Sequence, residues 1–115
     1  MEKTLIHGYE EIEKGLGYSP TFHDDMIISI MIELEKVEIV ILVDSNNNHL
    51  SPKKVKISFF EVKQLNLQGM FYGVVCIIRD IIQKKEDDFI ETTIESSLGV
   101  EANISSKIVN IELVD

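Results

Sequence analysis

The stretch MIISIMIELEKVEIVILV, residues 26–43, decides the fold class. In its first half alternate residues are apolar, and we expect them to share the buried face of a strand: Met26, Ile28, Ile30, Ile32 and Leu34. The second half repeats the alternation at Val37, Ile39, Ile41 and Val43. A period of two indicates β-strands, and the short interval predicts an antiparallel hairpin that turns near Glu35 and Lys36.

Further alternating runs predict more strands downstream. Val55, Ile57 and Phe59 indicate a third strand, and a bulge or irregular crossing near Glu61 would explain why the apolar face shifts afterwards. The β-branched run 74–82 favours another strand, followed by a charged turn over 83–88. Residues 89–96 indicate a strand, and the alternating runs 100–105 and 109–113 predict a C-terminal hairpin or meander.

The N-terminal residues carry a helical pattern instead. Leu5, Tyr9, Ile12 and Leu16 recur at spacings of four, three and four, which predicts a helix over 4–14 capped by Thr4 and ended by Gly15 and Gly17. We therefore expect a single domain over residues 1–115. Its predicted class is α+β and strand-rich, with one antiparallel sheet of six or seven strands, curled or sandwich-like, and the helix covering an edge or end.

The charge of the chain excludes some partners and favours others. It has 11 Lys and Arg against 20 Asp and Glu, a formal net charge of -9, so binding to nucleic acid or to an anionic membrane is disfavoured. The first residues lack the charged head and long apolar stretch typical of a signal peptide, and no apolar window reaches the length of a membrane span, so we expect a cytoplasmic protein. The negative electrostatic field of the chain would attract a basic partner. The alternative is that the excess of acidic residues only keeps the protein soluble.

No catalytic or cofactor motif is found in the sequence, so we expect neither an enzyme nor a bound cofactor. Cys76, the only cysteine, lies in an apolar run and is predicted to be a buried, unreactive thiol. The histidines, His7, His23 and His49, lack ligand-like spacing. His23-Asp24-Asp25 would need distant residues to hold a metal. The alternative is a structural turn, with Phe22 in the core and the Asp24 or Asp25 carboxylate bonded to nearby amides.

The residues around that turn resemble a known family. The run Gly17-Tyr18-Ser19-Pro20-Thr21-Phe22-His23-Asp24-Asp25 is similar to the Pro-Ser-Phe-His-Asp-Ala-Glu stretch of the immunity protein 50 family of bacterial polymorphic toxin systems. Pro20, Phe22, His23 and Asp24 match, Thr21 is a conservative change, and Asp25 and Met26 depart from the family's Ala and Glu. Residues 94–101 and the runs after them are similar to the family's closing hairpin.

The resemblance implies an antitoxin that binds one cognate toxin and blocks it. An acidic inhibitor can fill a basic toxin cleft in place of a nucleic-acid backbone, with fast, electrostatically steered association. Candidate partner-binding carboxylates, which we expect to point outward or to lie in loops, are Glu33, Glu35, Glu38, Asp87 and Asp88. The alternative is a structural or homodimeric interaction domain joined through sheet edges or exposed apolar residues such as Phe60.

Overall fold

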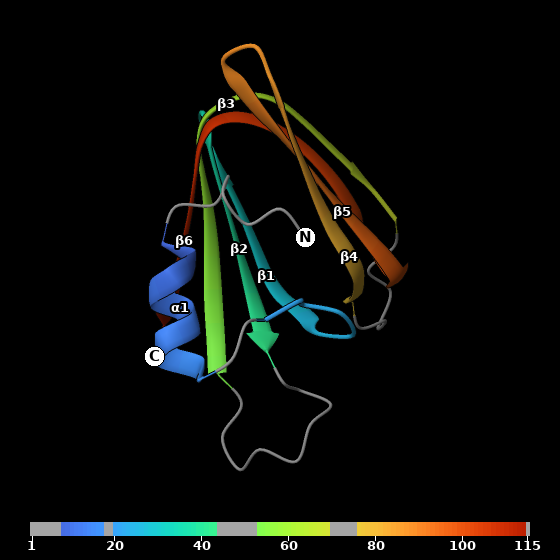
Figure 1. The fold of residues 1–115 in the computed structure, drawn as a ribbon. Coiled ribbons are helices and arrows are strands. Elements are labelled where there is room, and N and C mark those ends of the chain that lie inside the picture. Colours follow the sequence, from blue (N-terminus) through green and yellow to red (C-terminus); the bar gives the residue numbers. More distant parts are fainter. Residues whose placement is uncertain (1–7, 18–19, 44–52, 70–75, 115) are drawn as a thin grey trace.

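The computed structural model describes residues 8–17, 20–43, 53–69 and 76–114 (Figure 1). One helix precedes six strands in the described chain. Their bounds are α1 (Tyr9–Leu16), β1 (Met26–Glu33), β2 (Lys36–Val43), β3 (Lys53–Gln68), β4 (Cys76–Glu86), β5 (Phe89–Leu98) and β6 (Glu101–Val114). The α+β, strand-rich class with an N-terminal helix is confirmed.

The six strands form one antiparallel sheet that curls into a closed barrel, in the order β1-β2-β3-β6-β5-β4. Two residue pairs join the last strand to the first, Met26 with Ile77 and Ile27 with Cys76. Of the two arrangements expected from the sequence, the curled sheet is therefore the one observed. Closure leaves few strand edges free, which is how small β-proteins limit unwanted strand pairing.

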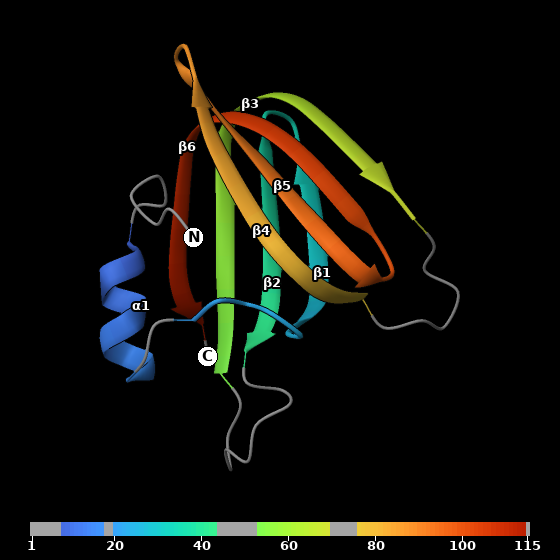
Figure 2. The ribbon, with the colours of Figure 1, turned by 45° about the vertical axis from the view of Figure 1, so that its right-hand side comes forward.

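The two longest strands, β3 and β6, bend and thereby contribute to both halves of the barrel (Figure 2). β3 pairs with β2 up to Phe60 and with β6 along most of its length. Its pairing with β6 shifts register between Val62 and Gln64, and Glu61 has a φ of 53°. The irregularity expected near Glu61 is thus confirmed as a bulge, which bends the strand and moves its apolar residues to another face.

The β1–β2 hairpin is also confirmed, with Glu33 opposite Lys36 and a turn at Leu34 and Glu35. Alternate residues of the paired strands β2 and β3 lie side by side on the buried face of the sheet. These are Val37, Ile39, Ile41 and Val43 on β2, and Val55, Ile57 and Phe59 on β3, all of them buried. The period of two in these segments therefore correctly predicts which side chains are buried.

β1 does not follow its predicted alternation. The register with β2 shifts between Ile27 and Ser29, so Ile27 faces the core while Ile28 is 45% exposed and Leu34 is 93% exposed. The prediction of one buried face from Met26 to Leu34 is wrong for two physical reasons. A bulge adds one residue and resets the alternation, and β4 covers this strand only as far as Ile27.

Two other boundaries differ from the predictions. The C-terminus is the continuous strand β6 instead of a hairpin or meander, because β3 pairs with it from Glu101 to Val114. The charged segment 83–88 is mostly strand, since β4 pairs with β5 up to Glu86 opposite Phe89. Its turn is confined to Asp87 and Asp88, where Asp87 has a φ of 54°.

The helix α1 lies beside β6, as both views show. Tyr9 and Ile12 are its buried residues, and Gly17 ends it in a left-handed conformation with its amide donating to Glu13 O at 2.8 Å. Gly15 lies inside the helix, so its predicted role as terminator is wrong, and the predicted cap Thr4 lies outside the described residues. No described helix has both the length and the apolar character that crossing a membrane requires.

Candidate functional site

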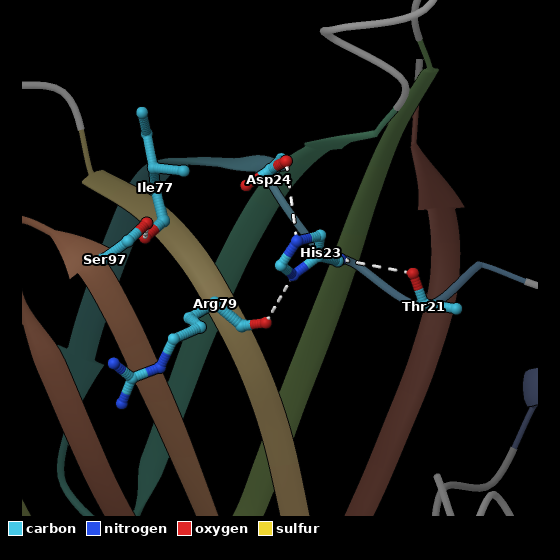
Figure 3. Close-up of polar contacts among 6 residues, drawn as sticks. All are labelled: Thr21, His23, Asp24, Ile77, Arg79 and Ser97. Carbon is cyan, nitrogen blue, oxygen red and sulfur yellow. Dashed lines mark hydrogen bonds and ion pairs between the residues drawn. The ribbon is translucent and has the colours of Figure 1, made fainter.

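Residues 20–25, a described part of the segment that resembles the family, lead into β1 and lie beside β4, where His23 contacts the carbonyl of Arg79 (Figure 3). The Asp24 amide donates to Ile78 O at 2.8 Å, and the Ile78 amide donates to Asp25 O at 2.9 Å. Asp25 also donates its amide to Phe22 O at 3.1 Å, which closes a tight turn. These main-chain bonds lead directly into the short β1–β4 pairing, so the segment helps to complete the barrel.

Phe22 is the apolar anchor of this turn. Its side chain is 1% exposed, which confirms the prediction that it packs in the core. Pro20 is buried as well, and its carbonyl accepts the Tyr9 hydroxyl at 2.5 Å. Phe22 has a φ of 64° and Asp24 one of 65°, a conformation that costs L-residues energy and is held here by burial and by the bonds to Ile78.

His23 is turned outward, and its ring connects the segment to β4. The carbonyl of Arg79 can only accept, so His23 Nδ1 donates to it at 2.8 Å. His23 Nε2 lies 3.6 Å from Asp24 Oδ2. The Arg79 carbonyl, and then the Asp24 carboxylate, raise the pKa of His23 above its ordinary value. The predicted bond from the Asp24 or Asp25 carboxylate to a nearby amide stays a prediction.

Side chains on both sides of β4 bond to its main chain. Figure 3 shows Ser97 on the neighbouring strand, where its hydroxyl donates to Ile77 O at 3.5 Å, a second side-chain bond to β4 main chain. Among the described residues no three His, Cys, Asp or Glu side chains gather as a metal site. His7 and His49 lie outside the described residues. His23 through its ring, and Asp24 and Asp25 through their main chain, thus bond to β4, and a role for these residues at an interface stays a prediction.

Cys76 is buried where β4 meets β1, as the sequence predicts. Its Sγ accepts the Val100 amide at 3.3 Å and donates to Val100 O at 3.4 Å. A thiol that is enclosed and already bonded on both sides has little access to solvent. Its predicted lack of reactivity stays a prediction.

The candidate carboxylates fall into two groups. Glu33, Glu35, Asp87 and Asp88 lie at or beside the β1–β2 and β4–β5 turns, which both views place at the same end of the barrel. All four are exposed. Glu38 is separate from them in the middle of β2, where its side chain is 17% exposed and lies 3.3 Å from Lys36 Nζ and 3.6 Å from Lys56 Nζ.

The sequence predictions missed a polar pocket on the outer face of β2, β3 and β6. Strand register puts Glu38, Ser58 and Asn110 in one row across the three strands, and this row lines a cavity of about 340 Å³ beside the start of α1. Charged residues at alternate positions of β2 and β3 were the available signal. Without the register they could not be joined to Asn110 on β6.

Comparisons with known proteins give no family for the chain: no protein-family model matches it, and a search of curated proteins finds no match.

Proposed function

We propose that this protein is an immunity protein, an antitoxin that binds a cognate bacterial toxin domain and blocks a basic site on it with an acidic surface. The observation that carries the proposal is the formal net charge of -9 on a chain of 115 residues. The resemblance of residues 17–25 to the immunity protein 50 family supplies the class of partner. An inhibitor of this kind works by occupying a site and needs no catalytic group of its own.

The geometry suggests which carboxylates act first. Glu35, Asp87 and Asp88 are exposed at one end of the barrel and form no ion pair with another described residue. Glu33 lies 3.9 Å from Lys36 Nζ, and Glu38 forms ion pairs with both Lys36 and Lys56. The lysines therefore partly neutralise the charges of both carboxylates. Unpaired, exposed charges contribute most to long-range attraction of a basic partner. We therefore assign the steering role to Glu35, Asp87 and Asp88.

Co-expression with a candidate toxin domain encoded by a neighbouring gene tests the proposal directly. We expect survival of the host and co-purification of the two proteins. If steering dominates, raising salt from about 0.05 to 0.5 M slows association by roughly an order of magnitude and changes dissociation much less, because screening acts on encounter. A toxin domain that fails to bind would disprove the proposal, and a salt-independent association rate would disprove its electrostatic mechanism.

A charge-reversal pair locates the surface. Asp87→Lys with Asp88→Lys should slow association, whereas Glu10→Lys with Glu101→Lys makes the same change in net charge away from the barrel end and should slow it much less. Equal effects of the two double variants would mean that net charge alone, without a defined surface, attracts the toxin.

One observation favours the alternative, a homodimeric interaction domain. Beyond Ile27, β1 pairs only with β2 among the described strands, and it exposes Ile28, Met31 and Ile32. An edge with exposed apolar side chains can pair with a second copy. Sedimentation velocity over a wide concentration range checks this, and Met31→Glu would remove any dimer formed through that edge.

A further inference from the structure

The outer-face pocket has a defined floor and walls. Its floor is the row Glu38, Ser58 and Asn110. Phe60 with Lys36 lies in the row on one side, and Lys56 with Glu112 lies on the other, while the start of α1 closes the pocket beside β6. Gly8 permits this close approach, since a Cβ there would lie 2.5 Å from Ile111 O.

One polar atom at this pocket has no partner. Asn110 Oδ1 is buried and accepts no hydrogen bond from any described residue. Buried polar atoms in folded proteins are nearly always paired, and those that are not call for a donor from water or a ligand. Asn110 lines the pocket, so its Oδ1 is an acceptor that a donor entering the pocket could satisfy.

The charges at the pocket determine what kind of donor fits. Both lysines are already engaged: Lys36 Nζ lies 3.3 Å from Glu38 Oε2, and Lys56 Nζ lies 3.1 Å from Glu112 Oε1. Glu11 adds a third carboxylate to the lining, so carboxylates outnumber lysines. An anionic ligand would find no unpaired lysine and would bring no donor for Asn110. A cationic ligand with N–H groups would interact favourably with the excess carboxylates and would also donate to Asn110 Oδ1.

The potential inside the pocket agrees with this. Lys56 donates a hydrogen bond to the Glu112 carboxylate, and this bond, together with the charge of Glu38, raises the pKa of Lys56 above its ordinary value. The two carboxylates thus stabilise the positive charge of Lys56.

An aromatic wall favours a planar cation. Phe60 already has a cation over its ring, with Lys36 Nζ 5.6 Å from the ring centroid. A guanidinium stacks on an aromatic ring and carries five donors in a fixed fork, so it can reach an amide oxygen and a carboxylate together. An ammonium is a compact point charge that does not stack in this way.

We propose that this pocket receives an arginine side chain of the partner protein, which donates to Asn110 Oδ1 and to the carboxylate of Glu38 or Glu112 and stacks on Phe60. The identity of that partner as a toxin domain rests on the proposed function, but the chemistry of the pocket does not. Glu38 then acts in close contact at the pocket, while Glu35, Asp87 and Asp88 act at a distance.

The first test uses N-acetyl-arginine methylamide as a probe in an NMR titration of the intact chain. We expect saturable shifts at the Asn110 side-chain amide and at Ser58, with a Kd of roughly millimolar order for so small a ligand. The glutamine analogue, which lacks charge, and the lysine analogue, which lacks the planar fork, should bind more weakly. Absence of saturable shifts, or equal binding of all three probes, would overturn the inference.

Variants separate this pocket from the rest of the surface. Asn110→Leu keeps a similar volume without the acceptor and should abolish probe binding, whereas the matched Asn66→Leu on exposed β3 should leave it unchanged. If Asn110→Leu does not fold, Asn110→Asp retains the acceptors, adds a charge and should tighten binding several-fold. Unchanged probe binding by Asn110→Leu, or by Asn110→Asp in its place, would refute the role of Asn110.

The toxin domain distinguishes this inference from the proposed function. Asn110→Leu should speed dissociation of the complex by about tenfold, as expected for a central interface contact. Toxin binding with an unchanged dissociation rate in Asn110→Leu would overturn the pocket and leave the immunity function in place. Failure of the unmodified chain to bind the toxin, with probe binding intact, would overturn the function and leave the pocket in place.

Discussion

Replacing Phe22 by alanine tests whether the family-like turn is anchored from inside the barrel. The ring is 1% exposed and lies in the segment that bonds to Ile78 on β4. Removing a buried aromatic side chain costs about 3–5 kcal/mol of unfolding free energy. For a chain of 115 residues, the usual unfolding entropy per residue makes each kcal/mol worth about 4 °C. We therefore expect the Tm of Phe22→Ala to fall by about 12–20 °C.

Urea denaturation followed by circular dichroism gives the free energy directly. The m-value should stay unchanged if only the native state is affected. Leu34→Ala is the control, because Leu34 is 93% exposed and its truncation should change stability by less than about 0.5 kcal/mol. A loss of unfolding free energy below about 1 kcal/mol for Phe22→Ala would refute the reasoning, since removing a ring that packs in the core destabilises a protein by more than this.

A glycine variant adds a test of the backbone. Phe22 has a φ of 64°, a conformation that glycine adopts without strain. Alanine keeps the strain and glycine relieves it, so Phe22→Gly should be more stable than Phe22→Ala by about 1 kcal/mol. The reverse order would show that the turn relaxes once the ring is gone.

Three shorter predictions concern other positions. Cys76 should resist thiol reagents in the native protein, and rapid stoichiometric labelling without denaturant would contradict its burial. The pKa of His23 is raised in the folded chain, so its protonation should add stability that is fully present below the unfolded pKa of about 6.5 and is lost as pH rises through the folded pKa. Urea melts at several pH values should show this fall in unfolding free energy in the unmodified chain and not in His23→Gln. Gly8→Ala should destabilise more than Gly17→Ala in thermal melts, because a Cβ at Gly8 would meet Ile111 O at 2.5 Å while Gly17 has open space; equal losses would refute the clash.

The sequence predicted the buried position of Phe22 in the turn, but not the contacts that hold the turn to β4. The structural-turn interpretation of residues 22–25 predicts that Phe22 packs in the core, and its side chain is buried there. The bond from His23 to Arg79 O joins residues 56 positions apart, and no local pattern indicates it. Glu38, predicted to point outward as a candidate partner-binding carboxylate, lies within ion-pair distance of a lysine on its own strand and one on the adjacent strand, and its role toward a partner stays a prediction.

By itself the sequence determined part of the local structure. The alternation in β2 and the first half of β3 identified their buried faces, and the apolar spacing identified α1, because side-chain direction follows the period of the backbone. It also determined the net charge and the single cysteine, which constrain partners and covalent links whatever the fold.

Only the tertiary structure decided how the strands combine. The bulge in β1 turned Ile28 outward, and pairing with β3 kept β6 continuous where the sequence suggested a break. Closure of the barrel depends on two residue pairs between β1 and β4, far apart in the chain. The physical reason is that register and closure are set by contacts between distant segments, so the pocket at Asn110 exists only once three strands are aligned.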